Sequence, residues 1–247
     1  MKIIHKVYHD NCFTVLPNIK NESVDLIITD PPYGQNYSTG RQKHTIRKTT
    51  EIKYDKGNLD IEKLMWELNR VSKNESHIYI FTSWKTIDSW KPILEKYYVL
   101  KNILIWSKDL HTAGDLAWSY AQSYEMILFG MKGRKKLKGS RDRDCFFIDK
   151  IKGPKQLHLL QKPKKLITYF IEKSSNAGDI VLDPFAGSGT LGHCCMQTNR
   201  SSIQIEIEKK YIKNIVNRVK DKELFAKPQE VLLFKKGAKN GADKGKI

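Results

Sequence analysis

Six short apolar runs, rich in isoleucine, valine, leucine and aromatic residues, recur along the chain. Continuous apolarity over so few residues is typical of strands that are covered on both faces, as in a parallel sheet. The predicted strands are Val24–Thr29, Ile78–Thr82, Ile103–Trp106, Met126–Phe129, Ile180–Leu182 and Ile203–Ile207.

Longer segments with helical spacing of apolar residues separate these runs. The predicted helices are Leu59–Val71, Trp84–Tyr97, Lys164–Lys173, Leu191–Gln197 and Lys209–Val219. Alternation of strand and helix predicts a doubly wound α/β sheet. The length of 247 residues suits one large domain with at most a small appendage. We place the domain at residues 1–224 and a basic segment at 225–247, whose end, Lys235–Ile247, is expected to be mobile.

The chain is strongly basic, with 44 Lys and Arg against 27 Asp and Glu and a formal net charge of +17. Such an excess favours a polyanionic partner, because each neutralised phosphate releases condensed counterions. A generally basic proteome is the alternative explanation. The four cysteines have neither metal-ligand nor disulfide-framework spacing, and no apolar run reaches 18 residues. We therefore expect a soluble, cytoplasmic protein with no membrane partner.

The motif Asp30-Pro31-Pro32-Tyr33 directly follows the first predicted strand. The amino group of adenine or cytosine is a poor nucleophile, because its lone pair is delocalised into the ring. Two fixed hydrogen-bond acceptors, the Asp30 carboxylate and the Pro31 carbonyl, would localise that lone pair. Tyr33 offers a flat face on which a base can stack. The alternative is a proline-rich turn, but the carboxyl end of a strand is where open α/β sheets bind ligands.

A second motif, Asp183-Pro-Phe-Ala-Gly-Ser-Gly-Thr190, follows the strand Ile180–Leu182. Its glycines permit unusual backbone angles and close approach by a ligand. It is neither the full dinucleotide signature nor a phosphate loop, which suits S-adenosylmethionine because that cofactor has no pyrophosphate. Glu206 ends the next strand, about 20 residues further on, where an acid can accept hydrogen bonds from ribose hydroxyls.

With both motifs in place, the chain resembles the β class of DNA amino-methyltransferases from about Tyr8 to Arg218. In that class the catalytic half precedes the cofactor half, as here. The resemblance implies a Rossmann-like methyltransferase fold, a mostly parallel seven-stranded sheet with one reversed strand, Tyr124–Met131. It also implies catalytic roles for Asp30, Pro31, Pro32 and Tyr33.

The resemblance further implies which residues bind S-adenosylmethionine. His158-Leu-Leu-Gln-Lys162-Pro163 is similar to an element that touches the cofactor's methionine end, although the usual Pro-Thr is missing. Asp10 resembles an acid near the cofactor adenine, although His9 replaces a glycine; a helix N-cap before Cys12–Leu16 is its alternative role. The implied cofactor residues are Asp10, Asp30, Lys162, Asp183, Phe185, Ala186, Gly187, Ser188, Gly189, Thr190 and Glu206.

Asp-Pro-Pro-Tyr is more typical of N6-adenine enzymes, and Ser-Pro-Pro-Tyr of N4-cytosine enzymes. We therefore expect N6-adenine methylation of double-stranded DNA with base flipping. N4-cytosine methylation stays open, as does a catalytically silent DNA-binding subunit. A homodimer and a cognate restriction endonuclease are further expected partners.

Two basic stretches, 34–57 and 131–154, flank the proposed site in the sequence, and we expect them to grip DNA phosphates; solvated loops are the alternative. The candidate DNA-binding residues are Arg41, Lys43, Arg47, Lys48, Arg134, Lys135, Lys136 and Arg141.

Overall fold

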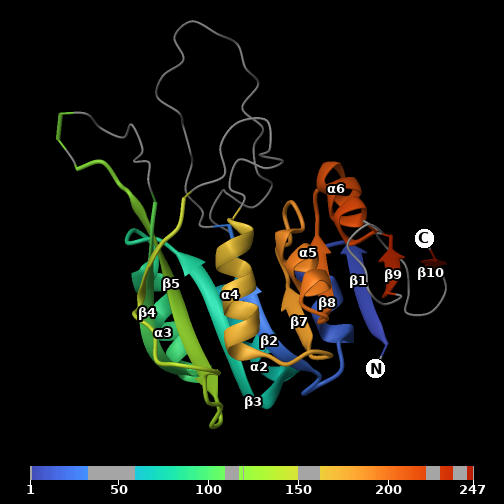
Figure 1. Cartoon of the computed structure of the whole chain (residues 1–247), viewed down its shortest axis with the longest axis horizontal. Helices are drawn as coiled ribbons and strands as arrows, with labels where there is room; N and C mark the ends of the chain where they lie inside the picture. The colour runs from blue at the N-terminus through green and yellow to red at the C-terminus, as the bar shows by residue number, and fades with distance from the viewer. Residues whose placement is uncertain are drawn as a thin grey trace, which may run out of the picture.

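A ten-stranded sheet forms the centre of the computed structural model, in the order β10-β9-β1-β8-β7-β2-β3-β5-β4-β6 (Figure 1). The structure describes residues 2–32, 59–108, 117–118, 120–149, 162–220, 229–235 and 244–246. The strands are β1 (Ile3–His9), β2 (Val24–Thr29), β3 (Ser72–Thr82), β4 (Val99–Ser107), β5 (Tyr124–Lys132), β6 (Cys145–Phe147), β7 (Ile180–Asp183), β8 (Ser201–Glu206), β9 (Gln229–Phe234) and β10 (Lys244–Lys246).

The helices lie close to their predicted positions. They are α1 (Cys12–Val15), the 3₁₀ turn η1 (Leu16–Asn18), α2 (Ile61–Val71), α3 (Ile87–Tyr97), α4 (Lys164–Ser174), α5 (Thr190–Gln197) and α6 (Lys209–Lys220). Figure 1 shows α4, α5 and α6 on one face of the sheet and α2 and α3 on the other. Among the described residues, no helix combines the length and apolarity that a membrane crossing requires.

The continuous apolar runs are explained by this double cover. Successive strand residues point to opposite faces. In β2, Ile27 packs in the cluster beneath α2 and α3, whereas Ile28 packs in the cluster beneath α4 and α5. Both side chains are buried among apolar residues, so a polar side chain without a partner would be costly at either position. The doubly wound α/β prediction is therefore confirmed.

The inner strands, from β1 to β4 in the sheet order, are the expected seven, with three further strands added at the edges. β5 runs antiparallel to both β3 and β4, which confirms the predicted reversed strand. β9 pairs parallel with β1, so the sheet continues past residue 224, where the sequence analysis ended the domain. β1 was not predicted as a strand, because polar residues interrupt its apolar run. One of these residues, His5, is buried and contacts Ser202 at 2.8 Å.

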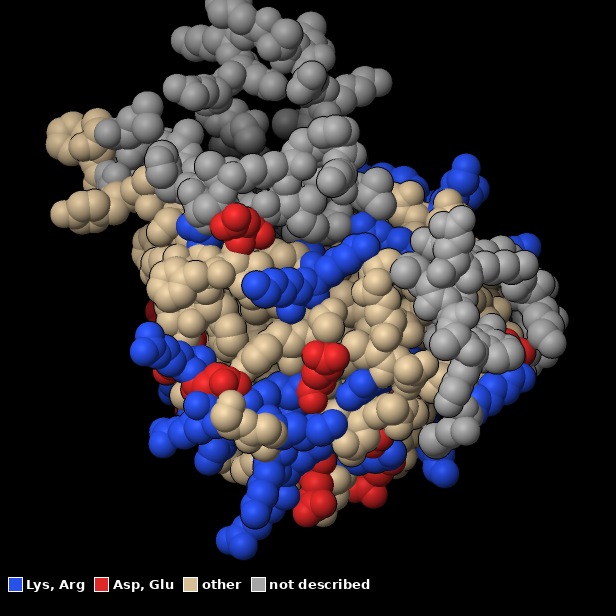
Figure 2. Space-filling model, in the orientation of Figure 1, with Lys and Arg blue, Asp and Glu red and all other residues tan. Residues whose placement is uncertain are grey.

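The reversed direction of β5 carries the basic segment after it to the amino-terminal edge of the parallel strands. The Lys135 carbonyl accepts a hydrogen bond from His77, and the Lys135 ammonium donates to the carbonyl of Asp25 near the start of β2 (3.1 Å each). Lys138 donates to the Ser175 carbonyl just after α4. Figure 2 shows Lys and Arg side chains gathered in the lower part of this face of the molecule.

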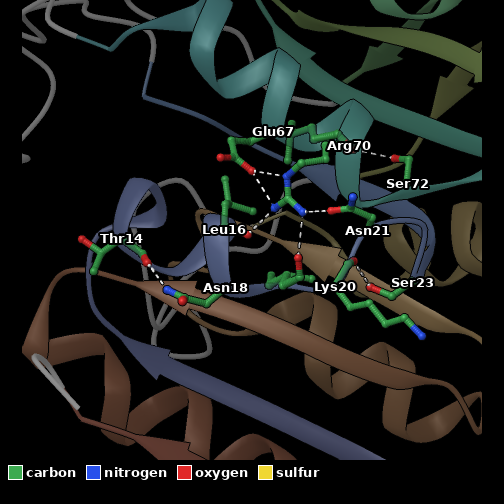
Figure 3. Close-up of polar contacts among 11 residues, drawn as sticks. Thr14, Leu16, Asn18, Lys20, Asn21, Ser23, Glu67, Arg70 and Ser72 are labelled. Atoms are coloured by element: carbon green, nitrogen blue, oxygen red, sulfur yellow. Dashed lines mark hydrogen bonds and ion pairs between the residues drawn. The ribbon is translucent and has the colours of Figure 1, made fainter. Parts of the chain in front are cut away.

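Arg70, near the end of α2, ties the α1–η1 segment to the helix that follows β2 (Figure 3). Its guanidinium donates to the buried Glu67 carboxylate at 2.7 and 2.9 Å. It also donates to the carbonyls of Leu16 (2.7 Å) and Ile19 (2.9 Å), and to the Asn21 side chain. These bonds fix the chain just before β2 begins, and β2 carries Asp30 at its other end.

Replacement of Arg70 by lysine should therefore lower the free energy of unfolding. An ammonium keeps the charge but has no planar fork, so it cannot reach Glu67 and two carbonyls at once. We expect a loss of about 1–2 kcal/mol, measured by urea denaturation. Lys91→Arg on the exposed face of α3, which keeps a charge in an exposed pair with Glu95, is the control and should change stability little.

Candidate active site

The two sequence motifs meet where the strand order reverses. β2 and β7 are adjacent and parallel, with Leu26 opposite Val181 and Ile27 opposite Leu182. From β2 the chain proceeds to β3 on one side, and from β7 to β8 on the other. Open α/β sheets bind ligands in the crevice at such a switch point. Asp30 and Asp183 therefore occupy neighbouring strand ends at the edge where a ligand is expected.

A hydrogen bond joins the two motifs directly. Thr29, the last residue of β2, donates through its hydroxyl to Asp183 Oδ1 at 3.2 Å, and the Phe185 amide donates to the same oxygen at 3.0 Å. Burial raises the pKa of Asp183 to about 7, although both hydrogen bonds oppose the rise. The Asp183 side chain thus closes the turn of its own loop and links it to β2.

The Asp30 carboxylate is held by a buried ammonium. Lys162, just before α4, places Nζ 2.6 Å from Asp30 Oδ2, and its side chain is only 9% exposed. The same ammonium lies 2.9 Å from Glu125 Oε2 and 4.8 Å from the centre of the Phe81 ring. The two carboxylates raise the pKa of Lys162 although its burial acts in the opposite direction. Lys162 therefore lies beside the proposed catalytic carboxylate, and its predicted contact with the cofactor stays a prediction.

The two glycines of the second loop have positive φ angles for different reasons. Gly187 has φ +50°, and a Cβ built on it would meet no atom within 4 Å. Gly189 has φ +77°, and its Cβ would lie 2.9 Å from the Ile215 Cα in α6. Gly187 thus leaves open space beside the loop, whereas Gly189 lets the loop approach α6.

The alanine variants of these two glycines should separate the two roles. In both variants, an alanine at a positive φ angle lowers the free energy of unfolding by about 1 kcal/mol. Only Gly189→Ala also clashes with backbone, so we expect it to lower the free energy of unfolding by about 2 kcal/mol more than Gly187→Ala. Urea denaturation of both variants measures the difference, and equal losses would contradict it.

Glu206 ends β8 beside this loop. Its Oε2 accepts a hydrogen bond from the Gly187 amide at 2.8 Å, and its Oε1 accepts from the Glu208 amide at 2.7 Å. Burial raises the pKa of Glu206 to about 7. Each carboxylate oxygen has two lone pairs, so both can accept a further hydrogen bond from a ligand hydroxyl.

Asp10 lies near the same strand end. His9 at the end of β1 is paired in register with Glu206, and Asp10 follows it. The alternative N-cap role for Asp10 is wrong, because Asn11 caps α1 by accepting from the Phe13 amide at 2.9 Å. Asp10 accepts instead from the Asn11 amide at 2.7 Å. The structure therefore brings Asp10, Glu206 and the glycine loop to one edge.

These residues fit S-adenosylmethionine. The space beside Gly187 is open, and Glu206 is a buried acid with spare acceptor capacity at the end of β8. The Ala186 amide is bonded to the Ile205 carbonyl at 2.9 Å, which fixes the loop against β8. The Thr190 hydroxyl is engaged by Arg218 at 3.0 Å and lies 3.3 Å from Ser188 Oγ. Hydroxyl and amide contacts of these loop residues with the cofactor stay predictions.

The basic candidates fall into two groups. Arg134, Lys136 and Arg141 are exposed, and Lys135 is half-buried and donates to the Asp25 carbonyl. All four belong to the segment at the amino-terminal edge, opposite the strand ends that carry Asp30. The structure therefore does not bring them together with the site. Tyr33, Arg41, Lys43, Arg47 and Lys48 lie outside the described residues, as does His158.

Three residues near the site were not predicted from the sequence: Thr29, Phe81 and Glu125. Thr29 and Phe81 lie within apolar runs and read as ordinary strand residues. Glu125 could have been found from the sequence, because it is an acid directly before the apolar residues of the reversed strand. The amino end of a reversed strand lies at the same edge as the carboxyl ends of its parallel neighbours, so its acid faces the site.

The chain is similar to known proteins over most of its length. A family model described as DNA methylase matches residues 24–217. The type II methyltransferase M.HpaI of Haemophilus parainfluenzae is 32% identical over 238 residues, covering 85% of this chain and 72% of the relative. The DNA adenine methyltransferase YhdJ of Escherichia coli is 30% identical over 86% of this chain and 82% of its own. The solved M1.HpyAVI–SAM complex is 27% identical, with a TM-score of 0.67 over 88% of this chain and 100% of its own.

Proposed function

We propose that this chain, which belongs to the DNA methylase family, methylates the exocyclic N6 of adenine in double-stranded DNA. Its cofactor is S-adenosylmethionine, which when bound supplies the electrophilic methyl group. The observation that carries the proposal is the position of Asp30 at the switch point, one strand away from the glycine loop and held by Lys162.

The residues around Asp30 give it the properties that this chemistry needs. Pairing with the Lys162 ammonium favours the ionised carboxylate, which can accept a hydrogen bond from the target amine. Pro31 is buried and Pro32 is half-buried, so the backbone that carries the second acceptor is restricted. We propose that Asp30 acts mainly as an acceptor and positioning group, since the amine proton can leave after the methyl group is transferred.

The choice of adenine over cytosine rests on the aspartate that opens the motif and on the similarity to YhdJ, whose name specifies adenine. The same acceptors suit the N4 amine of cytosine, so that target is the second candidate. The solved PvuII methyltransferase, named as cytosine-N4-specific, has the same fold at 15% identity, with a TM-score of 0.69. Fold alone does not distinguish the two bases.

Nucleoside mass spectrometry tests the proposal. Methylation-free double-stranded DNA is incubated with the protein and S-adenosylmethionine, then digested. N6-methyladenine supports the proposal, and N4-methylcytosine would replace the target base while keeping the site. If neither modified base forms, DNA amino-methylation is overturned and a silent subunit is favoured.

DNA contact by the basic residues at the amino-terminal edge is a separate proposal. Because that edge is opposite Asp30, a short duplex centred on the target cannot be expected to reach it. We expect the combined change of Arg134, Lys136 and Arg141 to glutamine to weaken binding of long DNA by about tenfold and to reduce its salt dependence. Rates on a short duplex should not change. Unaltered salt dependence on long DNA would show that these residues are only solvated.

A homodimer and a partner endonuclease stay proposals, which sedimentation and co-purification would test.

A further inference from the structure

Four charged side chains of alternating sign form a continuous row behind the site. Asp30 Oδ2 contacts Lys162 Nζ at 2.6 Å, Lys162 Nζ contacts Glu125 Oε2 at 2.9 Å, and Glu125 Oε1 contacts Lys108 Nζ at 2.6 Å. The residues come from the end of β2, the segment before α4, the start of β5 and the residue after β4. Four separate elements therefore converge on one row of charges that ends at the proposed catalytic carboxylate.

The three members of the row behind Asp30 are largely shielded from water. Lys108, Lys162 and Glu125 have side chains that are 8%, 9% and 16% exposed. Aromatic rings flank both ammonium groups: Lys162 lies over Phe81, and Lys108 lies 5.1 Å from the centre of the Trp106 ring. Charges in such surroundings interact more strongly than in water. Burial by itself would raise the pKa of Glu125, but Lys162 and Lys108 lower it to about 2, so Glu125 is ionised at neutral pH.

Stability alone is a weak reason for this arrangement. Removing two charges from water costs free energy that their attraction often fails to offset, and apolar side chains of similar size would serve the fold at least as well. The surrounding clusters are apolar and would accommodate such residues. A row of buried charges that reaches the reacting edge of the sheet is better explained by what it does to Asp30.

We infer that Glu125 is a positioning residue for methyl transfer, acting through Lys162 to set the orientation and acceptor strength of the Asp30 carboxylate. Glu125 shares the Lys162 ammonium with Asp30, so that ammonium is held between two carboxylates. Without the Glu125 charge, Lys162 would be drawn towards Asp30 alone. The carboxylate would then shift and become a weaker acceptor for the target amine. Lys108 in turn holds Glu125 in place. The inference rests on the proposed function.

The central test is Glu125→Gln, which keeps the shape of the side chain and removes its charge. We expect the single-turnover rate of methyl transfer to fall by about 10–100-fold, because small misplacements of a reacting group have effects of that size. The dissociation constants for S-adenosylmethionine and DNA should change much less than the rate, since Glu125 is linked to Asp30 through Lys162. Glu125→Asp should recover part of the rate. Glu95→Gln, in an exposed pair with Lys91 on α3, is the matched control and should have no effect.

A double-mutant cycle decides whether Glu125 acts through Asp30. In the Asp30→Asn background, Glu125→Gln should cause no further loss of the residual rate, because no carboxylate remains to be positioned. Equal losses in both backgrounds, or no loss in either, would overturn the inference. If Glu125→Gln fails to fold, Lys108→Met provides the same cycle, with an expected loss of about threefold that is likewise absent in the Asp30→Asn background. A wild-type protein that forms no methylated base would overturn the proposed function instead, before any variant is compared.

Discussion

Asp30→Asn should abolish most of the methyl-transfer activity, with a fall in the single-turnover rate of about 1,000-fold or more. The amide keeps the size of the carboxylate, but it loses the negative charge that pairs with Lys162 at 2.6 Å and that, in the proposed mechanism, accepts from the target amine. Removal of one preorganised hydrogen-bonding group from a catalytic site typically costs about 100- to 1,000-fold. Loss of the charge beside a buried ammonium adds to that cost. Quantification of methylated nucleosides in a single turnover measures the rate.

Two controls separate this effect from damage to the fold. Asp88→Asn removes a carboxylate from the first turn of α3, away from the site, and should leave the rate unchanged. Cofactor binding to Asp30→Asn, measured by calorimetry, should weaken far less than the rate falls, because the glycine loop and Glu206 are untouched. A variant that keeps more than a tenth of the wild-type rate would remove Asp30 from the catalytic role.

Glu206→Gln should weaken the binding of S-adenosylmethionine by about 10–100-fold at pH 8. A hydrogen bond to a charged group contributes about 1.5–3 kcal/mol, and the proposed ribose contact is of that kind. The wild-type affinity should also fall as the pH drops through 7. Burial raises the pKa of Glu206 to about 7, so the group becomes protonated there and loses the charge that strengthens the proposed ribose contact. Calorimetric titration between pH 6 and pH 8 measures both effects.

Two comparisons isolate the contribution of Glu206. The pH dependence should disappear in Glu206→Gln but remain in Asp183→Asn, although burial raises the pKa of Asp183 to about 7 as well. Methylthioadenosine, which carries the ribose but no amino-acid group, should reproduce the dependence. If its affinity is the same at pH 6 and pH 8, Glu206 does not bind the ribose in its ionised form.

The carboxyl groups of Glu206 and Asp183 should also make the free energy of unfolding depend on pH. Their folded-state pKa values near 7 lie above the ordinary values of 4.5 for Glu206 and 3.8 for Asp183. Between the ordinary and the raised values, the folded protein binds more protons than the unfolded chain. Stability without cofactor should therefore decrease as the pH rises from about 5 to about 7, and a bound cofactor that favours ionised Glu206 should offset part of the loss.

The sequence by itself determined the fold class and the two motifs, whereas the reversed strand was predicted only from the family resemblance. Short, continuously apolar runs are typical of strands buried on both faces, and Asp30 and Asp183 lie at the ends of two of them. Buried strands and the loops after them can be predicted from short stretches of sequence, because apolar runs, turn residues and glycines lie next to one another in the chain. The same local rule missed β1, because His5 is buried through a contact with Ser202 that lies far away in the sequence.

Only the tertiary structure decided which distant charges meet at the site and which do not. Lys162, Glu125 and Asp30 come from separate elements, and no spacing in the sequence implies that one ammonium lies between two carboxylates. The reversed direction of β5 has two consequences: it brings Glu125 to the edge that carries Asp30, and it carries Arg134 and its basic neighbours to the opposite edge. Strand direction is fixed by pairing across the whole sheet, so it cannot be derived from the residues of the strand alone.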